Sequence, residues 1–66
     1  MSVDYFLKNM TMYSRNKERL IIETYDGVIY DGKFDDLPIT LYFKIREMRV
    51  SFETSCREYE KIEIRY

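Results

Sequence analysis

The chain carries many acids, bases and tyrosines but no histidine, and this limits the chemistry that it can perform. Histidine is the commonest general base near neutral pH, so neither a Ser-His-Asp nor a Cys-His arrangement can be built here. Cys56 is the only cysteine, and Arg57 beside it could lower the thiol pKa, although such a pair is more often part of a plain turn. We therefore expect no catalytic residues, and a chain that binds without reacting.

Two adjacent carboxylates, Asp35 and Asp36, offer oxygen ligands for a hard cation. Neighbouring carboxylates without further oxygen ligands more often form a solvated turn. The glycines Gly27 and Gly32 fall within an expected hairpin and do not precede a helix, so the sequence holds no phosphate-binding loop. The sequence thus predicts neither a metal site nor a cofactor.

The segment from residue 23 to residue 36 predicts an acidic hairpin, in which Lys33 is the single basic residue. An acidic hairpin in a chain whose net charge is close to zero favours a protein partner over nucleic acid. A protein partner is the leading interpretation, and the candidate residues in this hairpin are Glu23, Asp26, Asp31, Asp35 and Asp36.

Tyrosines and basic residues make up a second candidate surface. A tyrosine ring adds a large contact area at small entropy cost, and it can also stack on a nucleic-acid base. Equally, tyrosines on neighbouring strands can do no more than shield a sheet. RNA or a nucleotide is the alternative ligand, although the net charge of −1 lacks a strong basic footprint. The residues of this surface are Tyr25, Tyr42, Tyr59, Lys44, Arg46, Arg49 and Arg57.

These side chains need elements that position them, and a chain of 66 residues has room for one domain. Residues 2–13 predict a short helix, because Ser2 can cap its start, Asp4 suits its first turn, and apolar residues recur at helical spacing. These apolar residues are Val3, Phe6, Leu7, Met10 and Tyr13. A polar linker, residues 14–18, is expected to follow.

Five runs with strand periodicity occupy residues 19–66. An Asp26-Gly27 turn is expected to join the first two, and Gly32 to let the second strand bend. Such alternation is typical of antiparallel strands with one buried face. We therefore expect a mainly β chain, in which a short N-terminal helix precedes a strongly bent, five-stranded antiparallel barrel. The apolar faces of the last three runs are Ile39, Leu41, Phe43 and Ile45, then Met48, Val50 and Phe52, then Ile62, Ile64 and Tyr66.

This order of elements resembles the Sm-like family of small SH3-like barrels. The residues that carry the resemblance are Phe6-Leu7, Leu20-Ile21-Ile22, Gly27, Gly32 and Phe34. The resemblance implies RNA binding by a ring of subunits, and it carries over only Arg57 and, loosely, Asp36 as ligand residues. The loop at residues 35–38 has no asparagine, and Glu58 stands where the family has a glycine.

A barrel with a negative surface is also similar to the small acidic Rof-type inhibitors, which cover a nucleic-acid site on another protein. That similarity implies a regulator that masks or inhibits a larger protein, and the small size suggests a phage or mobile-element origin. The last strand, residues 59–66, has no protective proline, which predicts a homo-oligomer through edge strands. A single cysteine and no long apolar run near the N-terminus indicate a cytoplasmic protein without a membrane segment.

Overall fold

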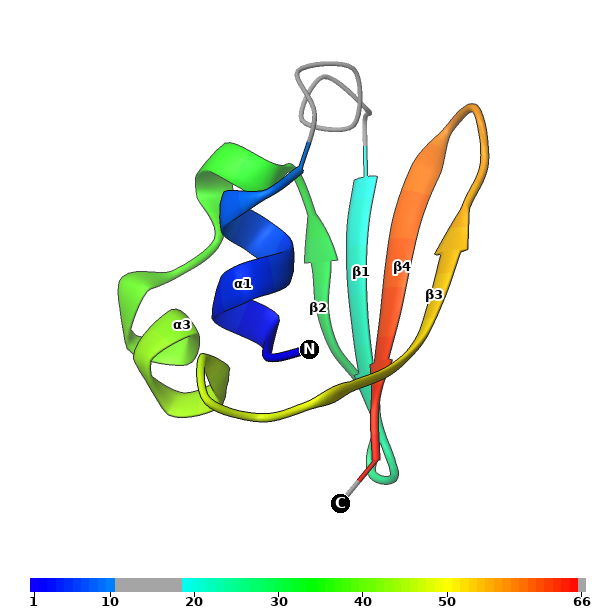
Figure 1. Cartoon of the computed structure of the whole chain (residues 1–66). Coiled ribbons are helices and arrows are strands. Elements are labelled where there is room, and N and C mark those ends of the chain that lie inside the picture. Colours follow the sequence, from blue (N-terminus) through cyan, green and yellow to red (C-terminus); the bar gives the residue numbers. More distant parts are fainter. Residues whose placement is uncertain (11–18, 66) are drawn as a thin grey trace.

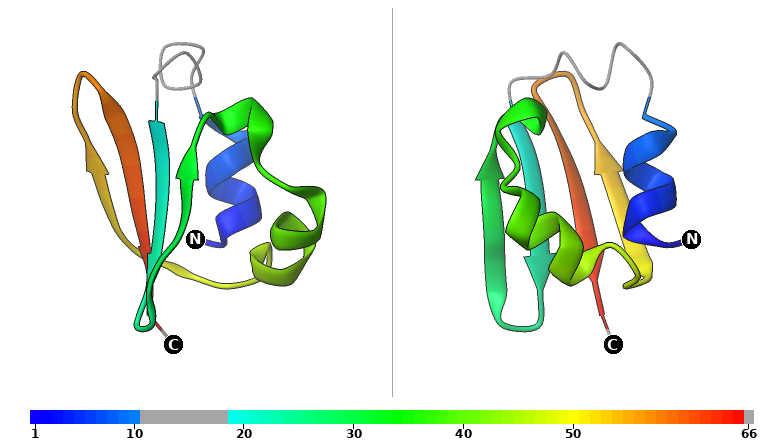
Figure 2. Two further views of the ribbon diagram at one scale, coloured as in Figure 1. Left: turned by 180° about the vertical axis from the view of Figure 1, so that it is seen from behind. Right: turned by 90° about the vertical axis from the view of Figure 1, so that its left-hand side faces the viewer.

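The computed structural model describes residues 1–10 and 19–65. Within them, one sheet of four strands is covered on one side by two short helices (Figures 1 and 2). The chain is therefore mainly β with a short N-terminal helix, as the sequence indicates. In chain order the elements are α1 (Val3–Lys8), β1 (Arg19–Thr24), β2 (Gly27–Gly32), the 3-10 helix η1 (Phe34–Asp36), α3 (Ile39–Ile45), β3 (Val50–Ser55) and β4 (Tyr59–Ile64).

The sheet is open and mixed, with the strand order β2-β1-β4-β3. β1 and β2 form one antiparallel hairpin, β3 and β4 form another, and the central strands β1 and β4 pair in parallel. The expected five-stranded antiparallel barrel is therefore wrong. The reason is that a crossover through η1 and α3 separates the two hairpins, and such a connection allows β4 to lie parallel to β1.

The third expected strand, residues 39–46, forms the helix α3 instead. The backbone carbonyl of Pro38 accepts a hydrogen bond from the amide of Tyr42 (3.0 Å) and so begins the helix. A short apolar run can suit either a strand or a buried helix, and periodicity alone does not separate them. Here the helix prevails because Leu41 and Ile45, one turn apart, pack on the core.

The core lies between the helices and the inner face of the sheet. Leu20 and Ile22 on β1 alternate with more exposed residues, as the sequence predicts. On β4 the buried row begins at Glu60, a carboxylate that is only 2 % exposed. The buried apolar residues are Val3, Phe6, Leu7, Leu20, Ile22, Ile45, Val50, Ile62 and Ile64.

The start of α1 confirms the predicted cap, because the Ser2 hydroxyl accepts a hydrogen bond from the amide of Tyr5 (3.1 Å). Two other amides of the first turn, which have no acceptor within the helix, donate hydrogen bonds to carbonyls far away in the sequence. The amide of Val3 donates to the carbonyl of Met48 (2.8 Å), and that of Asp4 donates to the carbonyl of Arg46 (2.9 Å). The segment after α3 thus holds the first turn of α1.

The helix α1 is shorter than the predicted range 2–13, because it ends at Lys8. The side-chain amide of Asn9 donates to the carbonyl of Tyr5 (2.8 Å) at this end. Residues 11–13 of the predicted helix, Tyr13 included, the predicted linker and Tyr66 lie outside the described residues.

The β1–β2 hairpin turns one residue earlier than expected, at Tyr25 and Asp26. Of the described residues only Gly27 has a positive φ (108°), so the prediction that Asp26 shares this conformation is wrong. Gly32 ends β2 without bending it within the strand. A Cβ at this position would lie 2.9 Å from the hydroxyl oxygen of Tyr30, so the missing side chain makes room for that ring.

Candidate functional site

The structure distributes the predicted acidic hairpin over three places. Asp26 lies in the turn at one end of β2, and Asp35 and Asp36 lie on η1 beyond the other end (Figure 1). Glu23 and Asp31 lie on neighbouring strands, on the side of the sheet that faces away from the helices. These residues do not form one continuous acidic surface, because the six-residue strand β2 separates the two ends of the hairpin.

The side chains of Glu23 and Asp31 are neutralised within the fold. Arg19 donates two hydrogen bonds to the Asp31 carboxylate, one of them from Nε at 2.9 Å, and this contact holds the pKa of Asp31 below its ordinary value. The Nζ atom of Lys61 lies 2.9 Å from the Glu23 carboxylate, whose hydrogen bond raises the pKa of Lys61. These two carboxylates stabilise the sheet and have little charge left for a partner.

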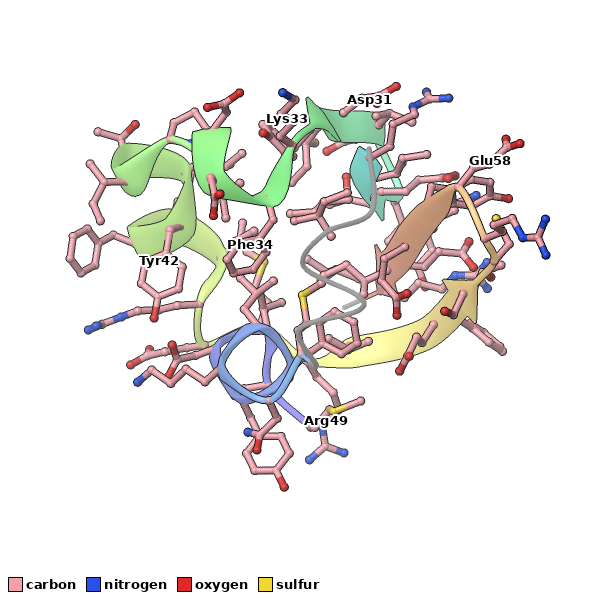
Figure 3. All side chains as sticks on the ribbon, turned by 90° about the horizontal axis from the view of Figure 1, so that it is seen from above. Asp31, Lys33, Phe34, Tyr42, Arg49 and Glu58 are labelled. Carbon is pink, nitrogen blue, oxygen red and sulfur yellow. The ribbon has the colours of Figure 1, made fainter. Side chains whose placement is uncertain are left out.

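The predicted tyrosines and basic residues are also dispersed. Tyr25 lies in the β1–β2 turn and Arg57 in the β3–β4 turn, at opposite ends of the sheet (Figure 1). Tyr59 is half-buried at the start of β4, and Arg49 lies below α1 in the view of Figure 3. These residues do not form one ligand-binding surface.

Tyr42 packs between α3 and α1 (Figure 3), where its hydroxyl donates a hydrogen bond to the Asp4 carboxylate. This bond holds the pKa of Asp4 below its ordinary value, and the nearby Lys8, with Nζ at 3.1 Å, acts in the same direction. The same bond raises the pKa of Tyr42. Tyr42 therefore joins the two helices, and its hydroxyl is already engaged.

Four of the predicted residues do gather around α3, together with two that the sequence placed in the core. Ile39 and Phe43 were expected to face inward, yet their side chains are 64 % and 58 % exposed. They lie one helical turn apart, so they share the outward side of the helix. We call this surface the α3 face, and it comprises Asp35, Asp36, Ile39, Phe43, Lys44 and Arg46.

Phe43 lies at the centre of this face. The Arg46 guanidinium lies over its ring, 5.2 Å from the centroid, and the ring of Tyr42 meets it edge-on with centroids 5.6 Å apart. An arginine stacked on an exposed aromatic ring is a frequent arrangement at the centre of protein interfaces.

A groove runs beside the α3 face, between α1, η1 and α3. Its volume is about 360 Å³, and its walls are mostly apolar. Lys8 and Asp35 are its charged residues. The other side chains that line it are Leu7, Phe34, Leu37, Ile39 and Tyr42.

Charges are ordered along the α3 face. Asp35 and Asp36 precede the start of the helix, whereas Lys44 and Arg46 lie at its end. Within the described part of the chain, none of these four side chains forms an ion pair. All four are exposed. Apart from the exposed Lys33 just before η1 and Glu47 just after α3, which carry the opposite sign to their neighbours, the face presents an acidic end, an apolar centre and a basic end.

The sequence does contain a signal for this arrangement, although alternation obscured it. Leu41, Tyr42, Ile45 and Met48 are spaced at intervals of one, three and three residues, which is compatible with one side of a helix. Choosing that period would have placed Ile39 and Phe43 outside.

Among the described residues, no group of three or more Asp, Glu, His or Cys side chains lies close enough to hold a metal ion. No helix in the same part of the chain is long and apolar enough to cross a membrane. Comparison of the chain with protein-family models, with curated proteins and with solved structures finds no match.

Proposed function

We propose that this chain is a small, non-enzymatic binding protein of the cytoplasm, which masks or inhibits a larger protein through the α3 face. The observation that carries the proposal is the exposed pair Ile39 and Phe43 beside an apolar groove. Isolated apolar residues are normal on protein surfaces, but adjacent large ones next to a concave surface are typical of interaction sites.

The residues around this pair support a protein as the partner. Phe43 and Arg46 belong to residue types that are enriched in protein interfaces. The unpaired charges at the two ends of the face would orient the partner. RNA or nucleotide binding receives less support, because Tyr42 is bound to Asp4 and Arg57 lies in the distant β3–β4 turn.

The experiment is affinity capture of the tagged chain from the cells that express it, followed by native mass spectrometry. Phe43→Asp is the test variant, and Phe52→Asp is its matched control. Phe52 is 56 % exposed and has Arg65 at 5.2 Å from its ring centroid, so it matches Phe43 in exposure and in its stacked arginine.

We expect the wild type and Phe52→Asp to retain the same larger protein, and Phe43→Asp to lose it while its circular dichroism stays unchanged. Loss of the partner from Phe52→Asp but not from Phe43→Asp would show that the interface lies on the far side of the sheet. Retention of the partner by both variants would overturn the assignment to the α3 face, and absence of any larger protein from the wild-type complex would overturn the masking function.

A further inference from the structure

We infer that the α3 face is self-complementary and that, in the absence of a larger partner, it is covered by a second copy of this chain. The two copies would pack α3 against α3 in antiparallel orientation about a two-fold axis. This inference rests on the proposed function, since the second copy covers the same face that the larger protein would bind. The pairing itself follows from the order of charges.

The order of charges is the first step of the argument. A two-fold axis perpendicular to α3 reverses the helix, so it brings the start of one copy's helix to the end of the other's. The acidic end, Asp35 and Asp36, then meets the basic end, Lys44 and Arg46, of the second copy. Because the interface is isologous, this favourable contact occurs twice.

The lateral positions of the charges agree with this pairing. Asp35 lines the groove beside α1, and Arg46 lies on the same side, where its backbone carbonyl accepts a hydrogen bond from the amide of Asp4 on α1 (2.9 Å). Asp36 lies towards β2, since its amide donates to the carbonyl of Lys33 (3.2 Å), which also accepts a hydrogen bond from the Tyr30 hydroxyl of β2. Lys44 lines a cleft together with Ile29 of β2. The two-fold operation keeps each side in place, so Asp35 faces Arg46 and Asp36 faces Lys44.

The apolar centre has the same symmetry. Ile39 and Phe43 lie at equal distances along the helix from residue 41, so Ile39 of one copy meets Phe43 of the other. Burial of two exposed apolar side chains from each copy supplies the driving force, and the peripheral charges fix the register.

Other surfaces of the described chain lack this property. On the far side of the sheet the charges are paired within the chain, through Arg19 with Asp31 and Lys61 with Glu23. The first residue of β3 is already engaged, because the amide of Val50 donates a hydrogen bond to the carbonyl of Met1 (2.8 Å). The inferred pairing therefore uses a helix in place of the edge strands that the sequence suggested. Since the face is small, we expect a weak and reversible dimer.

The experiment is sedimentation velocity of the purified chain from micromolar to millimolar concentration. Two double variants reverse one end of the face each: the acid-reversed variant is Asp35→Lys with Asp36→Lys, and the base-reversed variant is Lys44→Glu with Arg46→Glu. The wild type should dimerise, and each variant alone should stay monomeric, because like charges then meet twice. An equimolar mixture of the two variants should form a heterodimer, in which every contact is again attractive.

A matched control excludes general attraction between oppositely charged chains. The variant Arg49→Glu with Arg57→Glu changes two basic residues outside the face, so its net charge, −1 − 4 = −5, equals that of the base-reversed variant. Mixed with the acid-reversed variant, it should not form a heterodimer. Three outcomes would overturn the inference. They are association in this control, a wild type that stays monomeric at every concentration, and homodimers of both reversed variants.

The two proposals fail separately. A monomeric wild type that still captures a larger protein through Phe43 removes the dimer and leaves the proposed function intact. The predicted heterodimer together with no captured protein supports the dimer and overturns the masking function. Where both hold, adding the captured protein should dissociate the dimer, since both use Phe43.

Discussion

Two exposed aromatic residues, Phe43 on α3 and Phe52 on β3, have almost the same local surroundings. They are 58 % and 56 % exposed, and each has an arginine 5.2 Å from its ring centroid. The arginines are Arg46 and Arg65 respectively. The stacked pair by itself therefore does not distinguish a binding surface from an ordinary one.

The surrounding charges differ between the two regions. Arg65 also contacts the Glu63 carboxylate at 3.3 Å, within a sheet face whose other charges are paired across strands. Among the described residues, neither Arg46 nor Lys44 forms an ion pair with a carboxylate. Asp35 and Asp36 likewise form no ion pair there. Charges that are satisfied within the fold stabilise it, whereas unpaired charges beside apolar side chains are available to another molecule.

The largest expected effect tests whether α3 has a buried and an exposed side. Ile45 is 2 % exposed and Ile39 is 64 % exposed, so the same substitution can be made at both positions. Ile45→Ala should lower the free energy of unfolding by about 2–5 kcal/mol, whereas Ile39→Ala should change it by less than about 0.5 kcal/mol. Urea denaturation followed by circular dichroism measures both.

A small domain can lose its fold entirely through Ile45→Ala, and in that case Ile45→Val serves in its place, with an expected loss of about 0.5–1.5 kcal/mol. Equal losses at positions 39 and 45 would mean that both side chains are buried, as in the strand expected from alternation. Phe43 would then belong to the core, and it could no longer be compared with Phe52 as an exposed residue.

A smaller effect is expected from reversing one charge in each region. Asp31→Lys replaces the ion pair with Arg19 by two neighbouring cations, and it should therefore lower the urea midpoint. Asp36→Lys should leave the midpoint unchanged, because no ion pair to Asp36 exists in the described part of the chain. Adding Arg19→Asp to the Asp31→Lys variant should recover stability. A loss of stability on Asp36→Lys equal to that on Asp31→Lys would contradict the distinction between the regions.

The smallest effect concerns acid pH. The pKa of Asp4 is lowered by Tyr42 and Lys8, and that of Asp31 is lowered by Arg19. A carboxylate with a lowered folded-state pKa stabilises the fold fully above its unfolded pKa, and this contribution is lost as the pH falls through the folded pKa. Asp4→Asn and Asp31→Asn should each reduce the decline of the melting temperature between neutral and strongly acidic pH.

A melting profile of Asp4→Asn that falls as steeply as the wild type would show that the contact between Tyr42 and Asp4 contributes nothing to stability. Tyr42→Phe provides the complementary variant, since it removes the donor and leaves the ring in place. Tyr42→Phe should reduce the decline less than Asp4→Asn does, because Lys8 still lowers the pKa of Asp4 when the Tyr42 hydroxyl is absent.

The mainly β character, the helix start at Ser2 and four of the five expected strands follow from local patterns. Ser2 caps α1 as its side chain suggests, and the alternation of Leu20 with Ile22 and of Ile62 with Ile64 matches the buried faces of β1 and β4. In β4 each buried isoleucine has a charged residue on either side, so only one orientation of the strand buries the apolar set.

Two local patterns failed because more than one structure satisfies them. Residues 39–45 suit a strand or a helix equally, and the contact of Tyr42 with Asp4 favours the helix. Phe52 follows an apolar alternation with Val50, but a register shift between these two residues turns Phe52 to the far side of the sheet. Both exposed aromatic residues of the comparison were thus predicted with the apolar faces of strands.

The sequence by itself determined which residues are apolar, where the first helix starts and where the hairpins turn to within about a residue, because these depend on neighbours along the chain. Only the tertiary structure decided that the central strands pair in parallel, that α3 is helical, and which charges stay unpaired. These features depend on contacts between segments far apart in sequence, such as the amide of Val3 with the carbonyl of Met48. The candidate site belongs to this second group, since tertiary contacts decided which apolar side chains stay exposed and which charges form no ion pair.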